Sequence, residues 1–232
     1  MARDVVIDAA LAAGLTVPLW RHRDSVSATA PSGDTFAGHR RLARNRRAMI
    51  LYVLVLVEGA AFFGGTGYLG ALLHGEYGLG LAWVGLILTL DGAAIFATSR
   101  LISRIRSTFT EERLILVGGA LMGGGYLLVL AFGKWEAAVP AVIALGAGFV
   151  FCHTTLQTRA TELDAARGTA ISLFAFALFV GSALGTALFG WLLATSGYDV
   201  VLLAAGAALL ALAVLAPRLT APPRSFAPVT SS

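Results

Sequence analysis

Charged residues and cysteine are both scarce in this sequence. Of its 232 residues only 13% are Asp, Glu, Lys or Arg, about half of the roughly 25% that is usual in soluble domains. So few charged side chains cannot cover a water-soluble domain, and the composition therefore excludes one. Cys152 is the only cysteine, so no intramolecular disulfide bond can form. Because it lies in an apolar run, we interpret it as a small buried hydrophobic residue.

Motifs for several kinds of chemistry are absent as well. The sequence has no phosphate-binding loop and no nucleotide fingerprint, and His153 has no second His or Cys at metal-ligand spacing. We therefore expect no metal and no cofactor. Ser182 with His153 could suggest an intramembrane serine protease, but Ser182 falls near the middle of its apolar segment and His153 near the end of its own. We expect no catalytic residues and no enzyme.

Long apolar segments dominate what is present. Hydrophobic residues make up 57% of the chain, which also has 27 glycines and a mean hydropathy of +0.80. About 20 helical residues cross the ~30 Å hydrocarbon core of a bilayer, and a helix satisfies its own backbone hydrogen bonds there. The sequence predicts an all-α polytopic membrane protein, with six transmembrane helices joined by short connections. The predicted spans are 48–73, 81–103, 114–132, 137–156, 168–194 and 199–216.

Polar segments flank this transmembrane domain, which we place at 48–217. Residues 1–47 are predicted to be a cytoplasmic N-terminal segment. Within it, the apolar stretch 5–20 is either an interfacial helix or the remnant of a spanning helix, because it is short for a full span. The basic stretch 21–47 is predicted to be a loop. Residues 218–232 carry three prolines and are predicted to be a disordered cytoplasmic tail.

The basic residues predict the orientation of the spans. If both termini face the cytoplasm, 16 of the 17 Lys and Arg residues lie inside, and only Lys134 lies outside. We therefore expect a multi-pass protein of the plasma membrane with both termini cytoplasmic. The cluster "HRRLARNRR" at 39–47 is interpreted as a juxtamembrane collar against anionic lipid rather than a nucleic-acid patch, since it directly precedes the first span.

Three stretches carry a resemblance to a known family. "TLQTRATELDAARGTAISLFAFALFVGSALGTALFGWLL" (155–193) resembles the tenth-to-eleventh helix region of the major facilitator superfamily, especially its drug- and sugar-efflux permeases. "YLGALLHGEYGLGLAWVGLILTL" (68–90) resembles the end of the seventh helix, the outer loop and the eighth helix of that family. "SRLISRIRSTFTEERLILVGG" (99–119) is similar to its cytoplasmic loop signature, with Arg104 and Arg113 at basic positions and Ser103 in place of the usual aspartate.

The resemblance implies one half of a larger fold. Members of this family have twelve spans in two six-helix halves, and this chain matches the second half over residues 48–216. Arg159 and Arg167 belong to the matching "TRATEL…RGTAISLF" stretch. The resemblance implies a half-transporter, which is either a fragment or one protomer of a homodimer. Its expected partners are the lipid bilayer, a small-molecule substrate, and a second copy or a complementary six-helix half.

Two acids lie in the middle of predicted spans. Glu58 and Asp91 are each the eleventh residue of their span. A charge at mid-membrane raises the free energy of insertion by about 2.5–3.5 kcal/mol, so each must face a cavity or the bundle interior, or carry a proton. No basic residue lies near the predicted midplane, so we expect no simple ion pair. Both acids are candidates for proton coupling or cation binding; the alternative is a neutral, hydrogen-bonded acid without a transport role.

Other candidates accompany these acids. His153 is a candidate for substrate or proton binding, and Thr154 and Gln157 lie beside it at a polar helix end. Phe62 follows Glu58 by four residues and shares its helix face, so it lines either a cavity or the core. Gly181 and Gly185 form a small-xxx-small pattern, which favours close helix packing in lipid.

The sequence therefore predicts a secondary transporter of the major facilitator type. We expect it to export a small molecule in exchange for protons, as a half-length chain. The alternative is a non-transporting fragment or a partner subunit of a split transporter.

Overall fold

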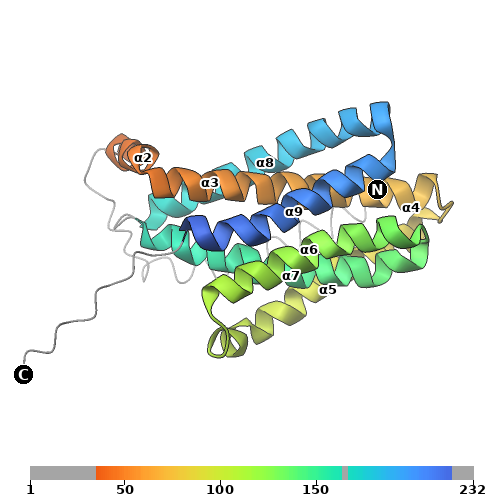
Figure 1. The fold of residues 1–232 in the computed structure, drawn as a ribbon, viewed down its shortest axis with the longest axis horizontal. Helices are drawn as coiled ribbons and strands as arrows, with labels where there is room; N and C mark the ends of the chain where they lie inside the picture. The colour runs from red at the N-terminus through yellow and green to blue at the C-terminus, as the bar shows by residue number, and fades with distance from the viewer. Residues whose placement is uncertain (1–34, 164–166, 221–232) are drawn as a thin grey trace, which may run out of the picture. The chain divides into compact units, whose positions relative to one another are not determined.

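The secondary structure of the described part of the chain is helical. The computed structural model describes residues 35–163 and 167–220, and within these ranges it contains no strand. The chain divides into two compact units, Met1–Ala37 and Gly38–Ser232, and the transmembrane helices belong to the second (Figure 1). The predicted apolar stretch 5–20 lies outside the described residues, as does the tail beyond residue 220.

Six helical stretches in the described residues are long and apolar enough to cross a membrane, and the all-α polytopic prediction is confirmed. The first combines α3 (Arg46–Gly59), the π-helical turn η2 (Ala60–Gly64) and α4 (Gly65–Gly75), and the fourth joins the 3-10 turn η3 (Trp135–Ala137) to α7. Helix α7 is Ala138–Glu162. Each of the other four spans is a single helix: α5 (Leu81–Arg106), α6 (Glu111–Phe132), α8 (Arg167–Ser196) and α9 (Tyr198–Thr220).

The basic stretch before the first span differs from the prediction. Residues 21–47 were expected to form a loop, but from Thr35 onward they form helix α2 (Thr35–Arg44) and the start of α3. Asn45 separates the two helices, because its side chain accepts hydrogen bonds from the backbone N–H groups of Arg47 and Ala48 and so caps α3. The loop prediction is wrong for this part, since it rested on a composition rich in Arg, Ser, Ala and Gly and did not consider the capping residue.

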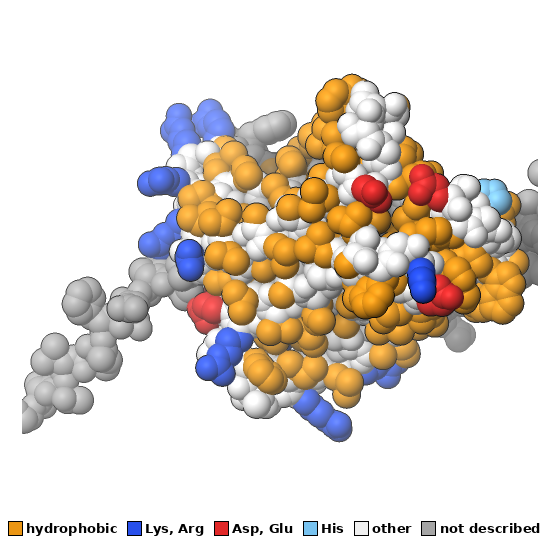
Figure 2. All heavy atoms as spheres, turned by 45° about the vertical axis from the view of Figure 1, so that its right-hand side comes forward, with side chains coloured by type: hydrophobic (Ala, Val, Ile, Leu, Met, Phe, Trp, Pro, Cys, Tyr) orange, Lys and Arg blue, Asp and Glu red, His pale blue; other side chains and the backbone are white. Residues whose placement is uncertain are grey.

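Short connections make successive spans antiparallel. Gly197 alone connects α8 to α9, and its φ of 82° lies in the left-handed region that favours glycine. Residues Arg46, Arg106, Arg159 and Arg218 consequently lie at one end of the bundle, which we call the basic end. Figure 2 shows most Lys and Arg side chains in view toward one end, and a broad apolar surface between the ends.

Helix α3 lies at the centre of one side of the bundle, between α8 and α9 (Figure 1). Helix α6 packs on α7 and α9, and α5 packs mainly on α7. The spans differ greatly in coverage. In the most apolar stretch of each span, the buried share is 61% for the first span, but only 28% for the α8 span and 11% for the α5 span. Helices α5 and α8 therefore present the largest uncovered surface to lipid or to a partner.

Glycines set the distance between α8 and the first span. A Cβ atom on Gly181 would overlap the carbonyl oxygen of Leu56, and one on Gly185 would overlap the backbone of Ala60. Across the same contact, a Cβ on Gly59 would overlap the carbonyl oxygen of Leu178. The two backbones thus touch directly, as small residues allow in membrane helices.

Replacing one of these glycines is expected to force the helices apart. Gly181→Ala should lower the free energy of unfolding by about 1–3 kcal/mol, the usual effect of overpacking, although alanine favours helix by about 1 kcal/mol. Thermal unfolding in detergent measures the change. Gly124→Ala is the matched control, because nothing lies within 4 Å of a Cβ there, and it should be neutral or stabilising. Equal unfolding temperatures for the two variants would contradict the packing role.

Candidate functional site

A buried glutamate–histidine pair lies inside the bundle. Glu58, in the last turn of α3, has no solvent-exposed surface. Its Oε2 atom is 3.0 Å from Nδ1 of His153 on α7, whose side chain is 16% exposed. The other carboxylate oxygen, Oε1, has no hydrogen-bond partner among the described residues. The pair therefore joins two spans far apart in sequence and leaves one buried acceptor unsatisfied.

This pair corrects the expectation that Glu58 has no basic partner. His153 was placed at the end of its span because the apolar run was taken to end at residue 156. Helix α7 in fact continues to Glu162, so His153 lies nine residues, about 14 Å, from the helix end. Glu58 lies about 18 Å from the start of α3 by the same rise. The two side chains are therefore at similar depth.

Aromatic rings surround the imidazole. The ring of Phe149 stacks on His153 at a centroid distance of 4.5 Å, and Phe174 of α8 meets it edge-on at 5.0 Å. Phe62, which is 2% exposed, stacks in turn on Phe149 at 4.4 Å. These rings hold the imidazole plane in place beside Glu58. The buried thiol of Cys152 lies beside the Glu58 carboxylate.

The arrangement can store a proton without moving a helix. With one proton shared between them, Glu58 and His153 form either a carboxylate–imidazolium pair or two neutral groups. A second proton leaves a net positive charge inside the bundle, which a low-dielectric environment disfavours unless something compensates it.

The π-helical turn η2 follows Glu58 directly. In a π turn the ordinary backbone hydrogen bonds shift by one residue, and such turns occur often at functional sites. The hydroxyl oxygen of Tyr126 on α6 lies 3.0 Å from the carbonyl oxygen of Phe62 and 3.3 Å from that of Ala61. It also lies 3.1 Å from the hydroxyl of Thr66, which donates to the Phe62 carbonyl. These contacts hold the turn against α6.

Sequence reasoning missed this network. Tyr126 is fully buried among apolar residues of α6, and a tyrosine in an apolar span is ordinarily interpreted as core. The available signal was the hydroxyl itself, because a buried tyrosine hydroxyl requires a hydrogen-bond partner.

Removing the Tyr126 hydroxyl should loosen the turn. Tyr126→Phe is expected to lower stability by about 1 kcal/mol, the usual net value of a buried hydrogen bond, and to speed backbone hydrogen exchange at residues 60–66. Tyr68→Phe is the matched control, since the Tyr68 hydroxyl also donates to a backbone carbonyl, that of Thr186, at 2.8 Å. Exchange at the π turn should not change in this control. Faster exchange in both variants, or in neither, would contradict a specific role for Tyr126.

The second acid, Asp91, is separate from the pair. It is half-buried on α5, and its Oδ1 atom is buried with no partner among the described residues. Helix α7 approaches closely at Gly146, where a Cβ would lie 2.9 Å from this oxygen. In the part of the chain that the structure describes, no hydrogen bond or ion pair joins Asp91 to Glu58 or His153. Asp91 is therefore a second acidic side chain within the membrane domain, without a direct contact to the first.

At the basic end a different cluster connects three helices. Arg159 of α7 is only 4% exposed and donates to Glu111 at 2.9 Å, Glu112 at 3.3 Å and the Thr220 hydroxyl at 2.6 Å. It thereby links α7 to the start of α6 and the end of α9. Arg159 was a sequence candidate, but its partners were not foreseen because the three segments are distant along the chain.

The remaining sequence candidates at this end have other surroundings. Thr154 and Gln157 are half-buried on α7, and the Thr154 hydroxyl donates to its own helix at Val150. A residue that was not a candidate, Arg106, donates to the Thr158 hydroxyl at 2.7 Å. The other basic candidates are exposed, namely Arg104, Arg113 and Arg167.

Breaking the Arg159 cluster should destabilise the bundle. Arg159→Met removes the shared cation and leaves two like charges together on α6. Because Glu111 and Glu112 are 39% and 50% exposed, water compensates in part, and we expect a loss of about 1–2 kcal/mol rather than the 3–5 kcal/mol of a fully buried pair.

Thermal unfolding in detergent measures this loss, and Arg104→Met at an exposed position is its control. Glu111→Gln combined with Arg159→Met should lose less than the sum of the two single changes, since the residues interact directly. Additive losses would show that the cluster does not act as a unit.

Comparison with known proteins was made for the whole chain. A family model described as a transmembrane secretion effector, of the major facilitator type, matches residues 5–231. The comparison with curated proteins finds no match. In the described residues no group of three or more His, Cys, Asp and Glu side chains could hold a metal ion.

Proposed function

Because the chain belongs to the transmembrane secretion effector family of the major facilitator superfamily, we propose that this membrane transporter exports a small molecule in exchange for protons. Glu58 and His153 carry the exchanged proton. The observation that supports this most strongly is the fully buried Glu58 carboxylate, paired at 3.0 Å with a partly exposed histidine.

The burial of Glu58 requires a reason. A charged carboxylate inside a membrane domain is unfavourable, and such residues usually belong to an ion or substrate pathway. A purely structural hydrogen bond could be supplied by a neutral side chain at lower free energy. The carboxylate has a second buried oxygen, Oε1, that can accept a further proton, and the 16% exposure of His153 gives protons a route to the pair.

Coupling follows if substrate and proton favour different states of the pair. A ligand shifts an equilibrium only through its different affinities for two states. A cationic or proton-releasing substrate near Glu58 binds best when the pair has lost its proton, and proton uptake then expels it. In this family type the two halves rock around such a central site.

The six spans form one half of the transporting unit in this proposal. Helices α5 and α8 have the lowest buried fractions, 11% and 28%, and a second six-helix unit would cover them. That unit is another copy of this chain or a complementary half. The protein lies in the plasma membrane with both termini cytoplasmic, which places the basic end inside, as the distribution of arginine predicts.

Glu58→Gln tests the proposal. The amide keeps the shape of the acid and mimics its protonated form, so the protein should fold but lose proton-driven transport at least a hundredfold. Purified protein in liposomes, with an imposed pH gradient and ethidium as an amphipathic cation probe, measures transport. A pH dye in the same vesicles measures proton movement.

Glu76→Gln is the matched control, because Glu76 is exposed at the opposite end of the first span. It should transport like the unchanged protein. Proton-driven uptake that survives in Glu58→Gln would contradict the proposal. Absence of transport in the unchanged protein, alone and with a complementary half, would favour a non-transporting subunit instead.

A further inference from the structure

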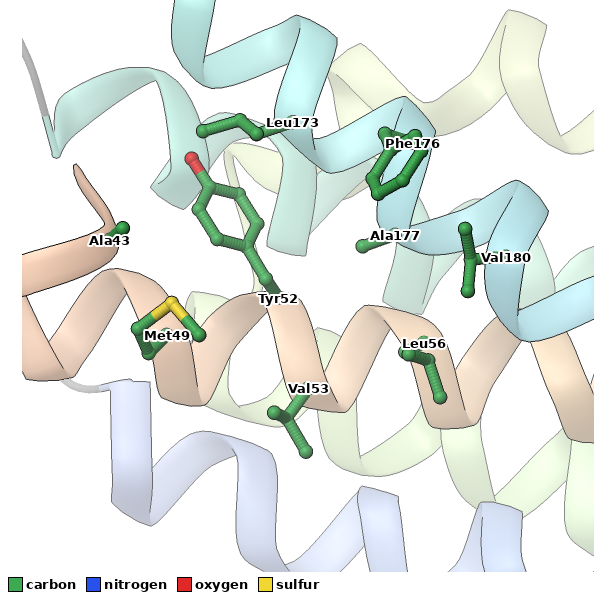
Figure 3. A pocket seen from close by; sticks show the side chains of 9 residues that line it. All are labelled: Ala43, Met49, Tyr52, Val53, Leu56, Leu173, Phe176, Ala177 and Val180. Carbon is green, nitrogen blue, oxygen red and sulfur yellow. The ribbon is translucent and has the colours of Figure 1, made fainter. Parts of the chain in front are cut away.

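Two apolar grooves lie on the outer side of α3. The first runs between α3 and α8 and has a volume of about 350 Å³. Figure 3 shows its lining, with Met49, Val53 and Leu56 along α3 and Phe176 and Val180 opposite them on α8. Apart from the Tyr52 hydroxyl, the labelled side chains are apolar. The groove is therefore suited to hydrocarbon and unsuited to a polar solute.

The second groove lies on the opposite flank of the same helix. It runs between α3 and α9 with a volume of about 510 Å³. Met49 and Val53 line both grooves and are 43% and 54% exposed. These two residues form a ridge that separates two parallel apolar channels.

Both grooves begin at the basic end. Arg46 lines the second groove, and Ala43, which lines the first, precedes Arg44. Arg40, Arg44, Arg46 and Arg47 are all exposed. Guanidinium groups bind phosphate oxygens in a bidentate geometry. An anionic group at this end, continuous with hydrocarbon in the grooves, would match both the charge and the apolar lining.

The length of the grooves fits one leaflet. Along α3 the second groove extends from Arg46 to Val57, about 17 Å at the helical rise, and the first from Met49 to Leu56, about 11 Å. Both lengths fit within one leaflet, half of the ~30 Å hydrocarbon core. An acyl chain of a phospholipid occupies this depth. A membrane-crossing helix of a partner would extend through the whole core, beyond the end of either groove.

The ridge also faces away from the candidate site. Met49 and Glu58 are nine residues apart, about two and a half helical turns, so they lie on opposite faces of α3. A second six-helix unit on α5 and α8 leaves the second groove uncovered, because α3 and α9 line it, and it borders the first groove along α8. We propose that one anionic phospholipid binds across α3, with one acyl chain in each groove and its phosphate at Arg46 and the neighbouring arginines. The proposal does not depend on the transport function.

Lipid retention tests this site directly. The full chain is purified in mild detergent, exposed to equal amounts of phosphatidylglycerol and phosphatidylcholine, and analysed by native mass spectrometry. One phosphatidylglycerol per chain should remain, at least tenfold in excess over phosphatidylcholine. Arg46→Gln with Arg47→Gln should lower this retention at least tenfold. Arg104→Gln with Arg113→Gln, at exposed positions on α5 and α6, should leave it unchanged.

A second pair of variants tests the grooves themselves. Ala211→Phe places a ring in the groove beside α9, and retention should fall at least fivefold. Ala207→Phe, also exposed on α9 but outside that lining, should have no effect. Unchanged unfolding temperatures show that both variants fold. Free glycerophosphoglycerol, the headgroup without chains, should not compete at equal concentration.

Three results would overturn the proposal. Equal retention of the two lipids would show that charge plays no part. Competition by the free headgroup would show a phosphate site without acyl recognition. A lipid-free dimer whose cross-links involve Met49 and Val53 would show that a second protein chain covers the ridge.

Discussion

The burial of one carboxylate constrains much of this membrane domain. Glu58 has no exposed surface, and its Oε2 atom lies 3.0 Å from Nδ1 of His153. Removing a charge from water is unfavourable by several kcal/mol unless a partner of opposite charge lies close by. Helices α3 and α7 must therefore keep these two side chains at the same depth. The aromatic rings of Phe149 and Phe174 fix the imidazole on its other sides.

The surroundings of the pair combine tight and adaptable contacts. On one side of the first span, glycines bring α8 into direct backbone contact, at Gly59, Gly181 and Gly185. On the other side, the Tyr126 hydroxyl donates to the carbonyl oxygens of Phe62 and Ala61 in the π turn, beside its backbone hydrogen bonds. A packed backbone contact resists rearrangement, whereas a π turn can change its register by breaking a few hydrogen bonds.

Helix α3 has different chemistry on its two faces. Its inner face carries the acid, and its outer face carries an apolar ridge between two grooves that begin at exposed arginines. The same helix thus carries a buried acid on one face and an exposed apolar surface on the other. The Arg159 cluster holds α6, α7 and α9 together at that basic end, so this end has ionic contacts and the middle of the bundle has few.

The sequence alone was sufficient for the fold class, the six spans and the family. These depend on hydrophobic length and on local motifs, which are local properties of the chain. It also identified Glu58, Asp91 and His153 as candidates, because a polar group in an apolar run is visible without a structure.

It could not show that Glu58 pairs with His153, that Asp91 stands apart, or that Tyr126 supports a π turn. Those facts depend on where helices end, how they pack and at what depth residues 60 to 100 positions apart meet. A few residues of error in the end of α7 were enough to hide the pair. Only the packed bundle determines these distances, because each depends on the contacts of several helices together.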